Sequence, residues 1–311
     1  MKRLSIGLIV VLALTAGSTA AMAAPGVLTA VIADLEQSPA VMADEALEGI
    51  LIAGATPAEG SAPAAAPAGG DSADELANKL ANPISDLISI PFQLNYDEGY
   101  GSRDVGWWTL KVQPVIPVGI SEDWNLITRV IAPFVWRQAP VHEAHYESGL
   151  GDINPSFFFS PKAPMAGFIW GVGPTFLLPT ATNADLGTRK WSAGPTAVVL
   201  RQEGPLTVGF LTNHLWSFAG NGDRDSVNVT FMQPFVSYGA WKGGTISLNA
   251  ESTYDWHNSD WTIPLNLMLG QILPIANVPV QFQIGVRYYA KSPDGGPEWG
   301  LRFGITILLP K

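Results

Sequence analysis

Two short stretches of the chain carry side chains that could do chemistry, and the first is a cluster of histidines and carboxylates. The run HEAHYE holds His142, Glu143, His145 and Glu147, and imidazole and carboxylate groups are common ligands of zinc and copper. The histidines are spaced H-x-x-H in an expected loop, whereas the metal-binding H-E-x-x-H pattern places two histidines one helical turn apart. We therefore interpret this stretch as a solvated loop, and we expect no metal or other cofactor.

The second stretch is NHLWSFAG, in which His214 precedes Ser217. A serine hydrolase needs its nucleophile within hydrogen-bonding reach of a general base that a third group orients. Side chains alternate between the two faces of a strand, so a spacing of three places His214 and Ser217 on opposite faces. No catalytic residues are therefore predicted, and an enzyme, here a lipid hydrolase, is the least favoured of the functions considered.

The first 23 residues predict export from the cytoplasm. Lys2 and Arg3 precede an apolar stretch over residues 6–14, and small residues at 21–23 provide a cleavage site. This order is typical of a secretory signal peptide over residues 1–23. A membrane-spanning helix would need about 20 apolar residues, and no later segment has such a run. The chain has no cysteine, so it offers neither a disulfide framework nor a thiolate metal site.

Acidic side chains are concentrated directly after this signal. Residues 24–78 carry nine acidic and no basic residues, and the whole chain has a net charge of −10. Residues 24–73 include an Ala/Pro/Gly-rich linker, ATPAEGSAPAAAPAGGDS, which lacks the apolar residues that a core requires. We predict an acidic, Ala/Pro-rich periplasmic tether over residues 24–73 that is largely disordered. The sequence has no basic patch, so nucleic acid is not an expected partner.

From residue 88 onward, polar and apolar residues alternate in segments that turn residues separate. In TISLNAESTYDW, residues 245–256, every odd position is polar, whereas the even positions are mostly apolar and include Leu248 and Trp256. Alternation with period two predicts a strand with one polar and one apolar face. About twelve strands are expected, near residues 88–98, 107–118, 124–136, 149–160, 168–179, 191–200, 206–218, 227–238, 245–256, 261–272, 280–289 and 299–309.

The tryptophans favour a membrane barrel over a soluble sandwich, whose strands would also alternate. All eleven lie close to an expected strand end, as the aromatic girdles of a barrel do at the two membrane interfaces. Eight fall at one end and three at the other: Trp107, Trp108, Trp136, Trp191, Trp216, Trp256, Trp261 and Trp299, against Trp124, Trp170 and Trp241. Connections at the tryptophan-rich end are mostly longer, as the outer loops of outer-membrane proteins are.

We therefore predict an all-β fold, a transmembrane antiparallel up-and-down β-barrel of about 12 strands over residues 88–311. A short N-terminal helical or disordered periplasmic segment precedes it. The expected location is the cell outer membrane, and the expected partners are outer-membrane lipids, the outer-membrane assembly machinery and a small-molecule solute.

Nine prolines lie inside expected strands, although proline removes a hydrogen-bond donor from the ladder. They are Pro91, Pro114, Pro117, Pro133, Pro155, Pro174, Pro195, Pro234 and Pro264. A closed barrel has no edge strand to accommodate them, so we predict repeated β-bulges.

Several stretches together resemble one family of bacterial proteins over about residues 76–311. They are NPISDLISIPFQLNYD, QPVIPVGISEDWNLITR, GLGDINPSFFFSPKAP, WGVGPTFLLPTAT, NHLWSFAG, ESTYDW and YYAKSPDGGPEWGLRF. The chain is similar to the outer-membrane β-barrel family labelled MetA-pathway of phenol degradation, whose members are often called transporter or neuromedin U. The resemblance implies movement of small, hydrophobic or aromatic compounds across the outer membrane, and it implies no active-site residues.

The inner face of the barrel is where a transport function would reside. Parity along the strands predicts these lumen-lining residues: Gln93, Asn95, Lys111, Gln113, Asn125, Arg129, Asp152, Asn154, Asn249, Glu251, Gln283, Arg287 and Arg302. They could line a polar path, which makes the protein a passive channel or transporter. They could instead pair across a filled interior, which makes it a structural barrel without transport activity.

Residues 74–87 predict a short amphipathic segment at the mouth of the barrel. Leu76, Leu80, Ile84 and Leu87 recur at intervals of four, four and three, which gives an apolar stripe on a helix. Such a short helix is marginal alone and needs a partner surface. We expect Leu76 and Leu80 to dock at the lumen mouth and to form a gating segment.

Overall fold

The computed structural model describes residues 72–138 and 146–309, so the predicted signal peptide and almost all of the predicted tether lie outside the described residues. One α-helix, α4 (Ala73–Ala81), precedes the strands. The strands are β1 (Ile88–Tyr100), β2 (Val105–Val112), β3 (Val115–Gly119), β4 (Trp124–Gln138), β5 (Tyr146–Leu150), β6 (Asn154–Pro161), β7 (Ile169–Leu177), β8 (Lys190–Glu203), β9 (Leu206–Gly220), β10 (Asn228–Trp241), β11 (Gly244–Ala250), β12 (Ser252–Asp255), β13 (Asp260–Ile275), β14 (Val278–Lys291) and β15 (Trp299–Leu309). The short 3-10 helices η2 (Gly101–Arg103) and η3 (Ala184–Leu186) lie in connections.

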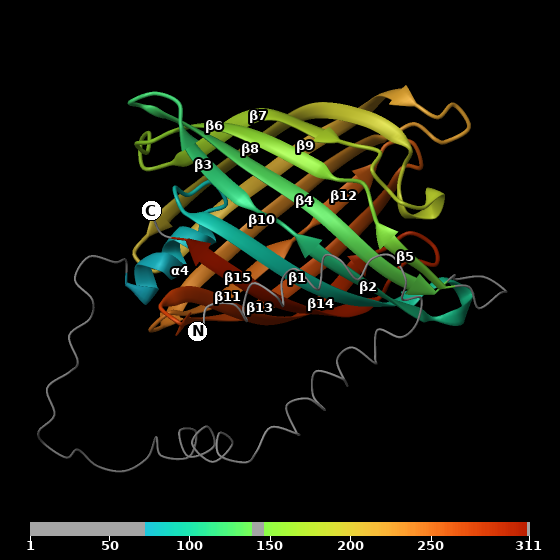
Figure 1. The fold of residues 1–311 in the computed structure, drawn as a ribbon. Coiled ribbons are helices and arrows are strands. Elements are labelled where there is room, and N and C mark those ends of the chain that lie inside the picture. Colours follow the sequence, from blue (N-terminus) through green and yellow to red (C-terminus); the bar gives the residue numbers. More distant parts are fainter. Residues whose placement is uncertain (1–71, 139–145, 310–311) are drawn as a thin grey trace, which may run out of the picture. The chain divides into compact units, whose positions relative to one another are not determined.

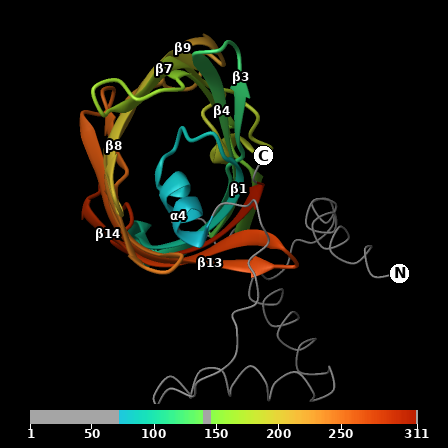
Figure 2. The same cartoon turned by 90° about the vertical axis from the view of Figure 1, so that its left-hand side faces the viewer.

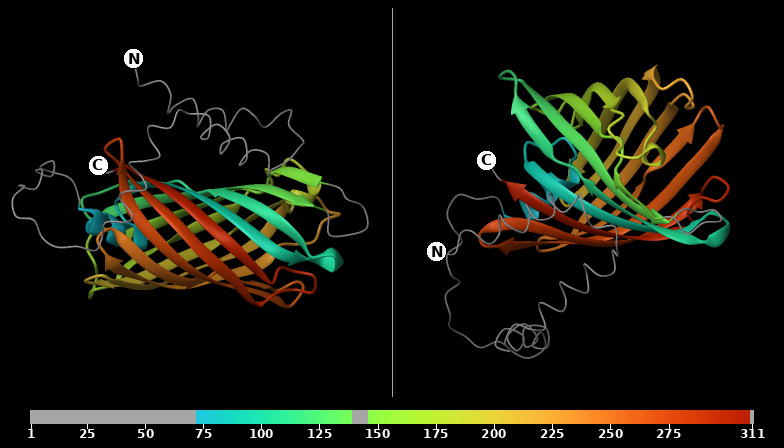
Figure 3. Two further views of the ribbon diagram at one scale, coloured as in Figure 1. Left: turned by 90° about the horizontal axis from the view of Figure 1, so that it is seen from below. Right: turned by 45° about the vertical axis from the view of Figure 1, so that its right-hand side comes forward.

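The strands form one closed antiparallel β-barrel (Figures 1 and 3). Three of its strands are interrupted, because β2 continues as β3, β5 as β6 and β11 as β12, so the described segments make twelve strands in all. Each pairs with its neighbours in sequence, and β1 pairs with β15 along its length to close the circle. The predicted fold class and strand number are confirmed.

The two faces of the wall differ as the alternation predicts. On β13, Leu265, Leu267 and Leu269 are exposed on the outer face, whereas the intervening Asn266 and Met268 are buried. On β11, Leu248 is exposed on the outer face and Thr245 is buried on the inner one. The outer surface is therefore a continuous apolar belt, which water solvates poorly.

The two ends of the barrel can be told apart by their connections. At one end, β1 begins, β15 ends, and the connections are short: residues 204–205 join β8 to β9, and 242–243 join β10 to β11. Because α4 lies there, we name it the helix end. The other, tryptophan-rich end has longer connections, such as residues 178–189 between β7 and β8.

The predicted bulges at the prolines are wrong for most of these residues. Of the four register shifts in the described strands, only the one between Ile263 and Pro264 includes a proline. Pro174 and Pro195 face each other in register on β7 and β8. Between β6 and β7, which carry Pro155 and Pro174, the ladder is sparse and has two registered residue pairs. Side chains supply bonds there, as when the Thr175 hydroxyl donates to the Pro155 carbonyl at 3.3 Å.

The helix α4 has clear local start and stop signals. Ser72 and Glu75 form a capping box, in which the Ser72 hydroxyl accepts from the Glu75 N–H and the Glu75 carboxylate accepts from the Ser72 N–H. The helix ends before Pro83, since the residue preceding a proline favours extended geometry, as Asn82 adopts. Viewed along the barrel, α4 lies within the ring of strands (Figure 2). We call residues 73–87 the inner segment.

Within the described residues, no helix is long and apolar enough to cross a membrane.

Candidate functional site

The barrel interior carries a continuous chain of polar side chains along one wall, on β4, the break between β2 and β3, β1 and β15. Arg129 Nη2 donates to Gln113 Oε1 at 2.8 Å, and Gln113 Nε2 donates to Gln93 Oε1 at 3.4 Å. Gln93 Nε2 donates to Asn95 Oδ1 at 3.3 Å, and Arg302 Nε donates to the same oxygen at 2.8 Å. Five of the predicted lumen residues are therefore joined into one network, which we call the polar track.

The polar track ends in an ion pair that ties β15 to the interrupted strand. Arg302 is 2% exposed and donates from both terminal nitrogens to Glu251, at 2.8 and 2.9 Å. Glu251 lies between β11 and β12, where the strand is interrupted. The carboxylate reaches Arg302 across the inner faces of β13 and β14. A two-pronged pair of this kind fixes both side chains geometrically.

A second ion pair lies beside this one, and only one of its two members, Arg287, was predicted from the sequence as a lumen residue. Arg287 Nε is 3.0 Å from Asp97 Oδ1, a distance typical of an ion pair although the two atoms are not aligned for a hydrogen bond. Arg287 Nη2 also donates to the Tyr289 hydroxyl at 2.9 Å. Asp97 follows Asn95 by two residues, so the same parity argument would have included it.

Aromatic rings lie on the inner face near the tryptophan-rich end. Tyr100 and Trp107 stack with ring centroids 3.6 Å apart, and the Arg137 guanidinium lies 4.9 Å from the Trp107 ring. Trp107 pairs in register with the buried Asp97 and therefore faces inward, so it does not belong to an outer girdle as predicted. Arg137 also pairs with Glu147 at 2.6 Å.

The remaining predicted lumen residues have varied local contacts. Asn249 Oδ1 accepts from Asn266, which is fully buried, and Asn154 donates to Thr175 and to the Phe176 carbonyl. Asp152 accepts from Thr188 and so holds the connection after β7. Lys111 pairs in register with Gln93, Gln283 lies against Gly304, and Asn125 lines a pocket at the helix end.

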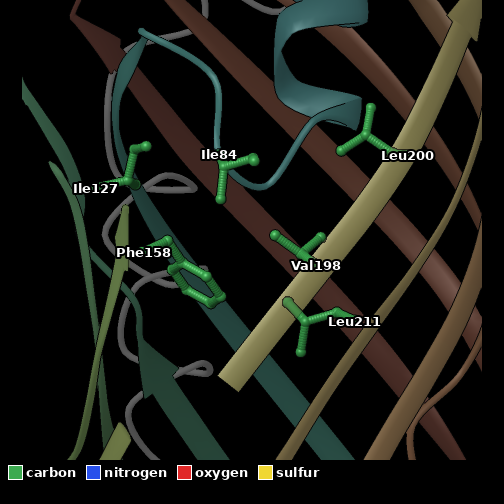
Figure 4. Packing of buried hydrophobic residues seen from close by; sticks show 6 residues of the cluster. All are labelled: Ile84, Ile127, Phe158, Val198, Leu200 and Leu211. Carbon is green, nitrogen blue, oxygen red and sulfur yellow. The ribbon is translucent and has the colours of Figure 1, made fainter. Parts of the chain in front are cut away.

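Next to the polar track, the wall from β4 to β9 is apolar toward the helix end, which sequence reasoning missed. Five buried side chains of β4, β6, β8 and β9 form one patch: Ile127, Phe158, Val198, Leu200 and Leu211. Ile84 of the inner segment inserts into this patch (Figure 4). A β-carbon built on Gly171 would lie 3.3 Å from Ile84 Cδ1, so the glycine leaves room for that side chain. We call these five residues the Ile84 patch.

The helix itself packs on a different part of the wall. Leu76, Ala77 and Leu87 are buried against Ile272 of β13 and Leu308 of β15, and Leu80 packs at the edge of this cluster. The inner segment thus reaches from β13 and β15 on one side to β4, β6, β8 and β9 on the other.

Two hydrogen bonds between side chain and backbone anchor the same segment. Gln202 Nε2 of β8 donates to the Asn78 carbonyl at 2.8 Å, and the Gly243 N–H donates to Asp74 Oδ1 at 2.6 Å. The apolar contacts hold α4 against the wall, and these two polar contacts fix its orientation.

An open pocket of about 510 Å³ remains beside the inner segment at the helix end. Polar side chains that include Asn82, Asn125 and Gln202 line it, and so does Ile169, which also packs against the Ile84 patch. Solvent therefore reaches the edge of that patch while the inner segment is seated.

The structure does not bring the considered catalytic pair together. His214 Nδ1 is 2.7 Å from Thr230 Oγ1, and its Nε2 is 3.0 Å from Asn228 Oδ1, whereas the Ser217 hydroxyl accepts from the Val227 N–H. His142, Glu143 and His145 lie outside the described residues. Among the side chains that the structure describes, no group of three or more His, Cys, Asp or Glu could hold a metal ion.

Comparison with known proteins supports the barrel fold. No protein family and no curated protein matches the chain. Among solved structures, it is similar to the COG4313 outer membrane channel from Pseudomonas putida F1, with a TM-score of 0.56 and 14% identity over 72% of this chain and 94% of that one.

Two further solved barrels are less similar. The NanC porin gives a TM-score of 0.44 and 14% identity over 71% of this chain and 100% of that one. The outer membrane phospholipase A from Escherichia coli gives 0.45 and 14% over 78% and 99%.

Proposed function

We propose that this protein is an outer-membrane channel for small solutes, and that the inner segment closes it at the helix end. The observation that carries the proposal is the position of residues 73–87, which contact opposite walls inside the barrel. A barrel of twelve strands is wider than the eight-stranded kind that side chains fill. Once this segment leaves, the lumen is lined by the polar track and the Ile84 patch.

The apolar outer belt supports the membrane location. Exposed leucine, isoleucine and valine side chains cover the outer face of consecutive strands, and a closed barrel satisfies its backbone groups without water. The solved barrel with the highest TM-score reported above is described as an outer membrane channel. Residues 1–23 then act as the signal peptide, the helix end faces the periplasm, and outer-membrane lipids and the assembly machinery are the partners. Membership of the MetA-pathway of phenol degradation family, with its hydrophobic solutes, belongs to the same proposal.

The inner segment is suited to act as a gate because side-chain contacts hold it, and no strand of the barrel pairs with it. Burial of Ile84, Leu76 and Leu87 stabilises the seated state by about 1.5–3 kcal/mol for each side chain. Each of the two anchoring hydrogen bonds adds roughly 1 kcal/mol. The barrel ladder, in contrast, closes without these residues. The segment can therefore leave while the wall stays folded.

Substitution of Ile84 tests this function. In planar lipid bilayers, Ile84→Asp should raise the single-channel conductance or the fraction of time open, because a carboxylate is costly to bury in the Ile84 patch. Ile84→Val, which removes one methylene, serves as the matched control and should behave like the unsubstituted protein. Equal, near-zero currents from both variants would favour a structural barrel without transport, provided that both proteins show the heat-dependent gel mobility of a folded barrel.

One observation favours a second candidate, the lipid hydrolase. Thr230, His214 and Asn228 form a hydroxyl–imidazole–amide series on the outer face, and Thr230 lines a pocket of about 410 Å³ with Tyr254, Trp256 and Trp261. Against it, the indole Nε1–H of Trp256 donates to Thr230 Oγ1 at 2.8 Å. The ladder with β9 also occupies the neighbouring backbone of β10, so free N–H donors for an oxyanion are lacking along this part of the described strand.

A further inference from the structure

Two adjoining layers of opposite chemistry line the barrel on the side where Ile84 inserts. Register places Ile127 opposite Phe158, and two residues nearer the tryptophan-rich end Arg129 lies opposite Ser156. Ser156 lies opposite Thr175 on the next strand, and their hydroxyl oxygens are 2.8 Å apart. Residues two apart on a strand are separated by about 7 Å. A polar layer therefore begins within one side-chain length of the Ile84 patch.

Arg129 differs from the other arginines of the inner wall in its partners. Arg137 pairs with Glu147, Arg287 with Asp97 and Arg302 with Glu251. Arg129 bonds to the neutral amide of Gln113, and no carboxylate of the described residues lies within ion-pairing distance of it. Its guanidinium therefore keeps donors for a carboxylate, which it can bind with two parallel bonds.

The local charge has the sign that such a ligand needs. Lys111 lies on the inner face of β2, next to the strand that carries Arg129, and pairs in register with the neutral Gln93. Lys111 and Arg129 add positive charge to a wall whose acidic members, Glu251 and Asp97, are already paired with arginines. An anion that enters the lumen is attracted to this side.

We propose that the lumen holds a binding site for a small amphipathic anion, a carboxylate on an apolar body. The carboxylate binds Arg129, and the apolar body fills the Ile84 patch in place of the Ile84 side chain. This inference rests on the proposed channel function, because the body can enter only after the inner segment moves. Ile84 and the ligand then exclude each other, so the ligand binds the open state alone and shifts the population toward it. The solute thereby opens its own channel.

Equilibrium dialysis tests the site directly. The probe is radiolabelled 4-phenylbutyrate, and the neutral 4-phenylbutanamide has nearly the same shape without the charge. Purified full-length protein in uncharged maltoside micelles should bind the acid saturably and the amide at least tenfold more weakly. Arg129→Gln should weaken binding of the acid at least tenfold. Ile84→Gly should tighten it severalfold, because the competing side chain is gone.

Arg201→Gln is the matched control, since the Arg201 side chain is exposed on the outer face and pairs with Glu203. The affinity of this variant for the acid should not change. Equal affinity for acid and amide in the unsubstituted protein would overturn the inference without any variant. Acid binding by a folded Arg129→Gln protein at the original affinity would also overturn it. Conductance of Ile84→Asp separates the two proposals. If this variant conducts but the protein binds the acid and the amide with equal affinity, the proposed channel function stands and the proposed binding site is wrong.

Discussion

Arg302 and Glu251 form a two-pronged ion pair inside the barrel, with Nη1–Oε1 at 2.8 Å and Nη2–Oε2 at 2.9 Å. Two strands, β13 and β14, separate the strands that carry them. The pair therefore links parts of the wall that do not share a hydrogen-bond ladder, and it braces the lumen at the end of the polar track.

Glu251→Gln should destabilise the barrel by about 3 kcal/mol, because it leaves the charge of the buried Arg302 without its carboxylate. Urea unfolding in lipid vesicles, followed by tryptophan fluorescence, measures the change. Glu203→Gln is the control, since its exposed pair with Arg201 should contribute less than about 1 kcal/mol. Equal stability losses in the two variants would show that the inner pair does not brace the wall.

The register of β11 can be tested with cysteines, because the chain has none of its own. A cysteine in place of Asn249, on the inner face, should react in vesicles with a small water-soluble thiol reagent. A cysteine in place of Leu248, which is 48% exposed on the outer face, should be shielded by lipid. Similar reaction rates at the two positions would contradict the assignment of the faces.

Gln202→Leu should make brief openings about fivefold more frequent. The change removes the hydrogen bond to the Asn78 carbonyl, which is worth roughly 1 kcal/mol, and thus weakens the seated state. Recordings in planar bilayers count the openings. Arg201→Gln, at the adjacent residue on the outer face, should leave the frequency unchanged, and an equal rise in both variants would exclude a role for this anchor.

The purified protein should not hydrolyse phospholipid, because the Thr230 oxygen already accepts from Trp256 and no oxyanion donors are free along this part of the described β10. Release of fatty acid from a fluorescent phospholipid in mixed micelles is the measurement. Hydrolysis that disappears in both Thr230→Val and His214→Ala would instead establish the hydrolase.

Much of the wall could be predicted from sequence because its physics is local. A membrane barrel alternates apolar and polar residues along each strand, so a stretch such as residues 245–256 already carries the orientation of its side chains. Parity likewise assigns Asn95, Glu251 and Arg302 to one face. Their pairing could not be predicted, since 51 residues separate Glu251 from Arg302 and their contact depends on the curvature of the closed wall.

The Ile84 patch could not be predicted for a different reason. Val198 and Leu200 on the inner face alternate with the apolar Val199 on the outer face, so β8 has no polar face there that alternation could detect. Apolar side chains face inward because the inner segment covers them. Local pattern does not reveal that a distant segment will fold inside the barrel.

The central claim, that the inner segment closes the channel, is tested most directly by two deletions compared in planar bilayers. Removing residues 24–71 leaves Ser72 and the capped helix in place, whereas removing residues 24–86 also removes α4 and Ile84. Both variants keep residues 1–23, the predicted signal peptide, and all the strands of the barrel. The account predicts that the shorter deletion conducts like the full chain and that the longer one has a severalfold larger single-channel conductance. Indistinguishable conductance from two correctly folded barrels would contradict it.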